Sequence, residues 1–166
     1  MSMQWLQENA PGFNKLSDDE RNAIVDFSLL WSLFEARILD NSGSASCICS
    51  VVDDWRDEKT LQAESYDPEL AYFRQRYFAN GDFTRHFEHL HLRDNDRPGL
   101  VRGAIAGDNN NPRDRVAALL IIILRFRNNL FHGMKWHYEL AGQLDNFDHA
   151  NAVLMKALDQ HGRLAV

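Results

Sequence analysis

The sequence is poor in residues that interrupt helices and in residues that cross-link chains. Its 166 residues include four prolines, nine glycines and two cysteines. Few prolines leave room for long helices, because proline breaks a helix interior. Cys47 and Cys49 are two positions apart, so on a helix they point to nearly opposite faces and cannot form a disulfide with each other. We expect them to be small core residues with reduced thiols, as is usual in the cytoplasm.

Long hydrophobic runs are also missing. The longest, VAALLIIIL at Val116–Leu124, has nine residues, whereas a helix needs about 20 apolar residues to span a bilayer. The first residues, MSMQWLQENAPG, lack the basic start and apolar stretch of a signal peptide. These two absences predict a cytoplasmic protein that has no membrane partner.

The net charge of −6 argues against indiscriminate binding to nucleic acid. The charges are unevenly distributed, however. The segment Arg93–Lys135 holds eight Arg or Lys residues against four Asp residues, a net charge of +4, which leaves −10 for the rest of the chain. A basic segment in an acidic chain can hold a short stretch of RNA without coating the protein in it.

The clearest helix signal begins at Ser17. Ser17 and Glu20 have the spacing of a capping box, which marks a helix start. Apolar residues then recur at helical spacings of three and four, at Ile24, Phe27, Trp31, Phe34 and Ile38. This pattern predicts a helix of about six turns that ends near Gly43.

Further helices are predicted over about 45–61, 67–80, 82–91, 112–132 and 145–161. Residues 92–111 read as a long internal loop, with a brief turn around Leu100–Ile105. The helix over 112–132 is apolar nearly all round, so it should be central. The sequence therefore predicts one all-α domain over residues 1–166, an up-and-down bundle of five to six helices around this central helix.

The central helix ends in polar residues, RFRNNLFHG at 125–133. Asn128 and His132 are four positions apart and share one face, with Arg127 on its shoulder. Arg125 and Asn129 share a second face. A histidine can move protons near neutral pH, an arginine fork can stabilise charge on a phosphorane, and an amide can orient either. Metal-independent RNA cleavage needs these groups.

The string RNNLFH, Arg127–His132, resembles the R-x4-6-H motif of HEPN domains, including the polar residue that follows the arginine. The capped helix FSLLWSLFEARIL resembles the early helix of that family, which carries an acidic residue facing the core. The resemblance spans roughly residues 17–161. It implies a helical bundle that dimerises and joins two motifs across a two-fold axis into one ribonuclease site. Many such proteins are toxins or antiphage effectors, and some have an antitoxin or regulatory protein as a partner.

The resemblance assigns roles to individual residues. It makes Arg127, Asn128 and His132 catalytic, with neither metal nor cofactor. Glu35 and Asn129 are expected to support the site, with Glu35 paired to Arg127 or Arg125. RNA binding is expected at Arg125, Lys135 and Arg102. The ends of two central helices should meet, with Arg125, Asn129 or Trp136 near the contact.

Other readings of these residues remain open. The cluster could cap the helix and anchor the last loop, or bind RNA without cleaving it, as a non-catalytic HEPN adaptor or antitoxin-like partner. A purely structural dimer is a third reading.

A second polar segment, RHFEHLH at 85–91, places His86 and His89 on one helix face with Asp82 four residues before His86. This segment suits a zinc site or an ordinary half-exposed helix. Trp136, His137 and Tyr138 follow the motif, where they could stack on a base or pack the last loop.

Overall fold

A computed structural model describes residues 1–133 and 140–164, and within them the chain is almost entirely helical. The α-helices are α1 (Ser2–Asn9), α2 (Asp18–Arg37), α3 (Ala45–Asp57), α4 (Asp67–Tyr77), α5 (Arg85–Glu88), α6 (Pro98–Ala106), α7 (Pro112–Phe131) and α9 (Leu144–His161). Three short 3-10 helices, η1 (Phe13–Lys15), η2 (Ala63–Tyr66) and η3 (Asp94–Asp96), lie between them. Strands β1 (Phe78–Ala79) and β2 (Asp82–Phe83) form a small antiparallel hairpin. The predicted all-α bundle is confirmed.

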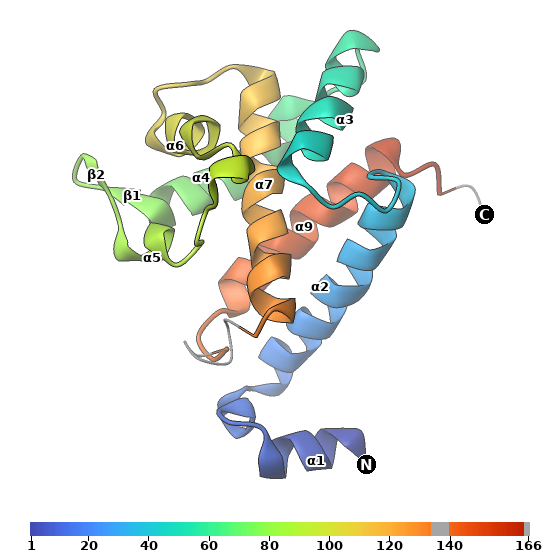
Figure 1. Cartoon of the computed structure of the whole chain (residues 1–166), viewed down its shortest axis with the longest axis vertical. Helices are drawn as coiled ribbons and strands as arrows, with labels where there is room; N and C mark the ends of the chain where they lie inside the picture. The colour runs from blue at the N-terminus through green and yellow to red at the C-terminus, as the bar shows by residue number, and fades with distance from the viewer. Residues whose placement is uncertain (134–139, 165–166) are drawn as a thin grey trace.

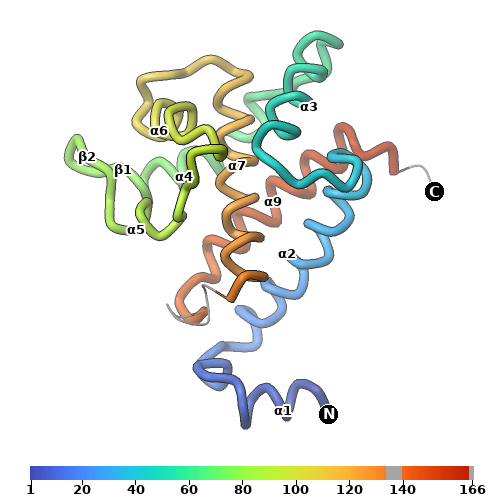
Figure 2. Tube along the Cα trace, viewed as in Figure 1, coloured from blue at the N-terminus to red at the C-terminus, as the bar shows by residue number. Residues whose placement is uncertain are grey.

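Helix α7 is the centre of the fold. Figures 1 and 2 show α4, α5 and α6 on one side of it and α2 on the other, with α3 beside its first half and α9 crossing behind it. Helix α2 starts at the predicted capping box, in which Ser17 Oγ accepts from the Glu20 amide and Glu20 accepts from the Ser17 amide. Helix α7 starts with Pro112 behind an Asn111 side chain that accepts from the amides of Arg113 and Asp114.

Helices α2 and α9 run in the same direction, from the end of the molecule where α7 terminates (Figure 1). Two hydrogen bonds far apart along the pair show this alignment. Asn151 Nδ2 donates to the carbonyl of Ala23 near the start of α2, and Arg37 donates to the carbonyl of Arg163 near its end. No helix in the described residues is both long and apolar enough to cross a membrane. Cys47 and Cys49 are both free thiols.

The predicted loop over residues 92–111 is the main error in the sequence reading. The structure places η3 and the nine-residue helix α6 there. Glycine-rich PGLVRGAIA has weak intrinsic helix propensity, but Val101, Ala104 and Ile105 are buried. Arg74 of α4 also donates to the carbonyl of Ala104 at 2.9 Å. Tertiary packing therefore decides this helix, and together with α1 it raises the helix count above the predicted five to six.

Arg125 fastens the segment before α6 to the central helix. Its side chain is only 3% exposed, and its Nε donates to the carbonyl of Leu90 at 3.0 Å. Its Nη1 lies 3.2 Å from Oδ2 of the buried Asp96, and that oxygen also accepts from the amide of Arg93. Burial lowers the pKa of the Arg125 guanidinium, and the negative charge of Asp96 opposes this shift. The charge of Arg125 is therefore compensated inside the protein.

Replacing Asp96 should test how much the fold depends on this pair. Asp96→Asn keeps the shape and the acceptor for Arg93 but leaves Arg125 as a buried charge without a counterion. Breaking such a pair from one side costs about 3–5 kcal/mol. We expect a loss of this size in the free energy of unfolding, measured by urea denaturation with circular dichroism. Asp94→Asn, at an exposed position of η3, should change the midpoint little. Equal midpoints for the two variants would contradict the role given to Asp96.

Candidate functional site

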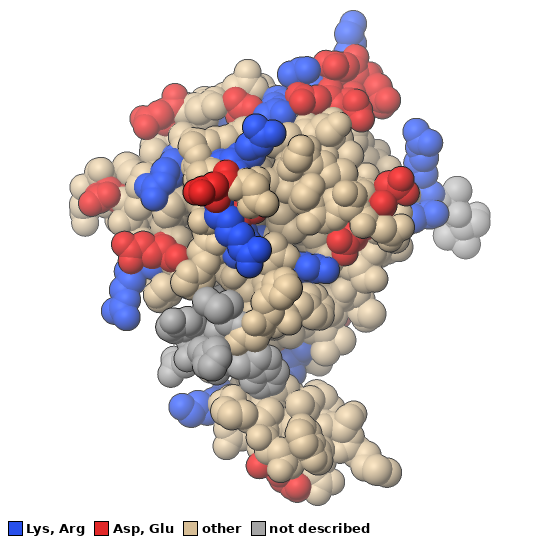
Figure 3. Space-filling view, viewed as in Figure 1, with Lys and Arg blue, Asp and Glu red and all other residues tan. Residues whose placement is uncertain are grey.

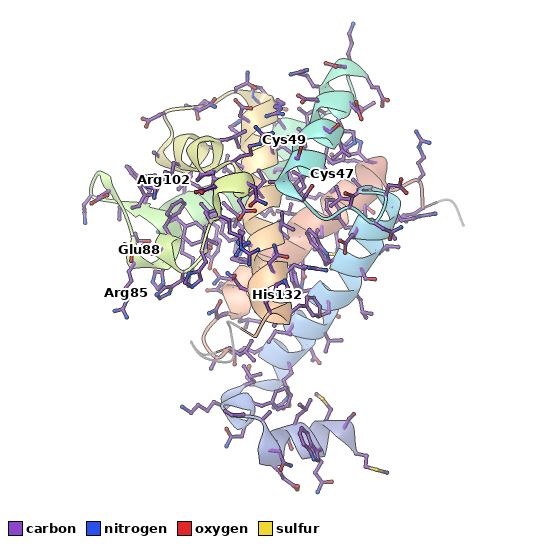
Figure 4. The ribbon with its side chains drawn as sticks, in the orientation of Figure 1. Cys47, Cys49, Arg85, Glu88, Arg102 and His132 are labelled. Carbon is purple, nitrogen blue, oxygen red and sulfur yellow. The ribbon has the colours of Figure 1, made fainter. Side chains whose placement is uncertain are left out.

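The predicted catalytic residues lie together where α7 ends. The last residue of the helix is Phe131, and His132 caps it, with its amide donating to the carbonyl of Asn128 at 2.9 Å. His132 is exposed, and Figure 4 shows it at the terminal turn of α7. Because the capping bond holds its backbone, the imidazole is attached to a rigid element and faces solvent.

Arg127 is held on two sides. Its Nη1 donates to Oδ1 of Asn128 at 3.1 Å, and its Cζ lies 5.6 Å from the ring centroid of Phe131. The side chain is 31% exposed. Its Nε is buried without a hydrogen-bond partner among the described residues. The guanidinium is thus positioned by protein contacts while part of it stays open to a ligand.

Glu35 approaches Arg127 from α2. Its Oε2 accepts from Trp31 Nε1 at 3.0 Å and lies 3.9 Å from Arg127 Nη2. Of the two arginines considered as partners for Glu35, Arg127 is therefore the one that it contacts, since Arg125 pairs with Asp96. The 3.9 Å separation is long, and the Glu35 side chain is 21% exposed, so the ion pair is weak. It orients Arg127 but does not neutralise its positive charge.

Gly43 is part of this arrangement and was missed in the sequence. A β-carbon at position 43 would collide with Glu35 Oε1 and approach the ring of Trp31. The turn after α2 therefore passes directly over the Glu35 carboxylate, and the missing side chain lets it do so. The sequence shows Gly43 only as a helix terminator, because nothing local indicates which side chain lies beneath the turn.

Arg125 and Asn129 occupy the opposite, internal side of α7. Asn129 Nδ2 donates to the carbonyls of His89 and Leu90, and its Oδ1 accepts from Arg125 Nη2 at 3.3 Å. Both residues are buried. The RNA-binding role predicted for Arg125 is corrected here, because its guanidinium cannot reach a phosphate. Asn129 holds the chain at His89 and Leu90, and its supporting role at the site stays a prediction.

Arg102, another RNA-binding candidate, does not extend the cluster. Arg102 lies on α6, where its Cζ sits 4.8 Å and 5.1 Å from the ring centroids of Phe83 and Phe87. Figure 4 shows Arg102 and His132 at separate places in the fold. Lys135 lies outside the described residues, as do Trp136, His137 and Tyr138.

The described part of the basic segment, residues 93–133, does not present a continuous positive surface. Arg113 donates from Nε to Asp53 Oδ1 at 2.8 Å and from Nη2 to Asp53 Oδ2 at 2.9 Å. Arg115 Nη1 lies 3.0 Å from Asp67 Oδ1. The hydrogen bond from Arg113 lowers the pKa of Asp53. Figure 3 shows Lys and Arg interspersed with Asp and Glu on the visible face. The predicted excess of positive charge is therefore partly neutralised within the fold.

Comparisons with models of protein families, with curated proteins and with solved structures found no match to this chain. The described residues contain no group of three or more His, Cys, Asp or Glu side chains placed to hold a metal ion. Asp82 therefore does not complete a three-ligand site with His86 and His89. The geometry at the end of α7 is the observation on which a function can be based.

The contact between Gly43 and Glu35 can be tested without knowing the function. Gly43→Ala should displace the Glu35 carboxylate and break its hydrogen bond to Trp31. We expect the Trp31 indole N–H signal to move in a ¹H–¹⁵N spectrum, in the same direction as in Glu35→Ala. Gly99→Ala is the matched control, because a β-carbon there has no atom within 4 Å. An unmoved Trp31 signal in Gly43→Ala would show that the carboxylate does not lie under the turn.

Proposed function

We propose that this chain is a metal-independent endoribonuclease of the HEPN type, active as a dimer and serving as a toxin or antiphage effector in the cytoplasm. The observation that carries the proposal is a half-open Arg127, oriented by Glu35 and Asn128, at the same helix end as the exposed His132. Arg127, Asn128 and His132 stand at the arginine, polar and histidine positions of the HEPN motif that RNNLFH resembles.

The reaction in this proposal is a transesterification. The ribose 2′-oxygen attacks the adjacent phosphorus and loses its proton, and the bond from phosphorus to the 5′-oxygen breaks. The departing oxygen takes up a proton. The products are a 2′,3′-cyclic phosphate and a 5′-hydroxyl. His132 transfers protons as general base or acid, and Arg127 stabilises the charge on the phosphorane oxygens.

Asn128 has a more definite role than the sequence alone suggests. Because its Oδ1 accepts from Arg127 Nη1, it holds the guanidinium in one orientation. We therefore assign Asn128 to positioning Arg127. A second protomer would supply a second Arg127 and His132, so that one imidazole can act as base while the other acts as acid.

A non-catalytic HEPN adaptor is the second candidate. Glu35 lies within ion-pair distance of Arg127, as expected where an arginine has a structural role. In that case the chain binds RNA or a regulatory protein and cleaves nothing.

Substitution at the end of α7 separates the two candidates. His132→Ala should lower the rate of RNA cleavage by about 10²–10⁴-fold, since a general acid–base group contributes that much. Folding should change little, because the side chain is exposed. Arg127→Ala should also abolish cleavage. Arg127→Lys should be no more active than Arg127→Ala, because an ammonium lacks the planar fork of a guanidinium. Cleavage of mixed cellular RNA is followed by gel electrophoresis with and without chelator, and His91→Ala is the control histidine. Dependence on a metal, or normal cleavage by His132→Ala, would contradict the assignment.

The composite site requires a particular dimer contact. Arg125 and Asn129, expected near it, are buried and cannot touch a partner. Phe131, adjacent to His132, is an apolar residue at this place that is 57% exposed in the described part of the chain. A second exposed apolar surface lies on α2 and α9, at Val25, Leu29, Leu33 and Met155.

Phe131→Glu should therefore dissociate the dimer and reduce cleavage, as measured by light scattering and the RNA assay. Leu29→Glu places the same charge on the other apolar surface and should leave both unchanged. A wild type that is monomeric at micromolar concentration, or a dimer broken by Leu29→Glu alone, would contradict a composite site at the ends of α7.

A further inference from the structure

A groove of about 360 Å³ lies between the middle turns of α2 and α9, the two helices that rise together in Figure 1. Its lining consists of Asp26, Leu29, Leu30, Leu33, Asn151 and Met155. Leu29, Leu33 and Met155 are exposed although they are apolar. Exposed apolar side chains that lie together commonly mark an interaction site. The groove shares no residue with the site at Arg127 and His132.

Asn151 is a polar residue of this lining that is only 7% exposed. Its Nδ2 donates to the carbonyl of Ala23 at 3.0 Å, which fixes the orientation of the amide. Its Oδ1 is buried without a hydrogen-bond partner among the described residues, and an unpaired buried acceptor costs free energy. Met155 follows four positions later on the same face of α9, and its unbranched side chain can move aside. A hydrogen-bond donor from another molecule would therefore satisfy Asn151.

Negative charge predominates on the two helices that form the groove. Helices α2 and α9 together carry eight Asp or Glu residues against three Lys or Arg residues. Asp26 belongs to the lining itself. Asp148 and Asp159, seven positions before and four positions after Met155, are exposed on the same face of α9. The apolar surface of the groove therefore has acidic residues beside it.

The three basic residues of α2 and α9 do little to offset this charge at the groove. Arg21 and Lys156 each form a salt bridge with an acidic residue. Arg37 is the last residue of α2, where it donates to the carbonyl of Arg163. The groove is therefore complementary to a ligand that is both apolar and positively charged.

We propose that this groove binds an amphipathic helix of a partner protein, with apolar residues on the face that enters the groove and Lys or Arg residues beside them. The stretch from Asp26 to Leu33 spans about 10 Å of α2, or two helical turns, so apolar anchors at i, i+4 and i+7 match its length. The anchors pack on Leu33 and Met155, a basic residue pairs with Asp26, and a donor reaches Asn151. The proposal does not depend on catalysis at Arg127.

The charge at the groove favours a different protein over a second copy of this chain. In a two-fold symmetric contact the same surface of each copy faces the other, so the acidic residues beside the groove would meet each other. Like charges that face each other oppose association. The dimer contact inferred above uses Phe131, which is not part of this lining. The partner helix should therefore bind while the dimer stays intact.

Two synthetic helical peptides test the surface and its charge preference. Both carry leucine at i, i+4 and i+7 of an alanine-based helix, and the flanking positions are lysine in one peptide and glutamate in the other. The full-length protein is labelled at its methionine methyl groups for NMR, because Met155 in the groove and Met3 on α1 are similarly exposed, at 48% and 45%. At millimolar concentration the lysine peptide should shift the Met155 signal and leave the Met3 signal in place. An unmoved Met155 signal, or equal shifts with the glutamate peptide, would overturn the proposal.

Matched variants then locate the binding, with affinity measured by the fluorescence anisotropy of a labelled lysine peptide. Met155→Ala should weaken binding about tenfold, the effect of removing an anchor of an interface, whereas Met3→Ala should not change it. Asp26→Asn should weaken binding severalfold, and Glu64→Gln, which removes an exposed charge from η2, should not. Equal losses within either pair of variants would reject the groove as the binding site.

A double-mutant cycle tests the hydrogen bond to Asn151. Replacing the middle leucine of the lysine peptide by glutamine offers a donor to Oδ1. Asn151→Leu removes this acceptor and keeps a side chain of similar size. The glutamine should therefore cost about three- to tenfold less affinity in the wild type than in Asn151→Leu, the range expected for one net hydrogen bond. An equal cost in both proteins would overturn the role given to Asn151.

Light scattering distinguishes a partner protein from a second copy of this chain. Leu29→Glu should lose the lysine peptide and keep the oligomeric state of the wild type, because the proposed occupant is another protein. A Leu29→Glu protein that is monomeric where the wild type is dimeric would overturn the proposal, since the occupant would then be a second copy. His132→Ala should bind the peptide like the wild type, so a failed ribonuclease assay leaves the peptide result standing.

Discussion

The structure depends on the enclosure of α7. Eleven consecutive residues, Val116–Phe126, are buried, and a fully buried Leu, Ile or Val side chain contributes about 1.5–3 kcal/mol each. A helix satisfies its own backbone hydrogen bonds, so it can be covered on all sides without leaving polar groups unpaired. The last turn of a helix cannot be covered in this way, because its terminal carbonyls and any polar side chains there need other partners. The polar end of α7 is therefore where the fold must either compensate charge internally or expose it.

The protein both compensates charge internally and exposes it, on opposite sides of the last turns of α7. Arg125 and Asn129 turn inward and hold residues 89–96 against the helix, through Leu90 and Asp96. Arg127 and His132 turn outward, toward α2 and solvent. This division explains why a short string with two arginines and two asparagines yields one structural pair and one candidate site. It also explains why Arg125 is buried against Asp96 while Arg127 stays partly exposed.

The contact between Glu35 and Arg127 allows Arg127 to be both oriented and available. An ion pair at 3.9 Å between side chains that are 31% and 21% exposed is weak, because solvent screens it. Glu35 is held more firmly by Trp31 and by the turn at Gly43 than by the arginine. An incoming phosphate could therefore compete for the guanidinium at small cost.

The sequence alone determined the helical class, the capped start of α2, the central position of α7 and the gathering of Arg127, Asn128 and His132 at one helix end. These features follow from local spacing and from an apolar run that only a core can accept. It could not reveal α6, whose glycines disfavour a helix until Val101 and Ile105 are buried. Only the tertiary structure decided that Arg125 meets Asp96 and that Gly43 lies over Glu35. Each of these contacts joins segments whose relative position depends on how the helices pack around α7, and no local pattern encodes that packing.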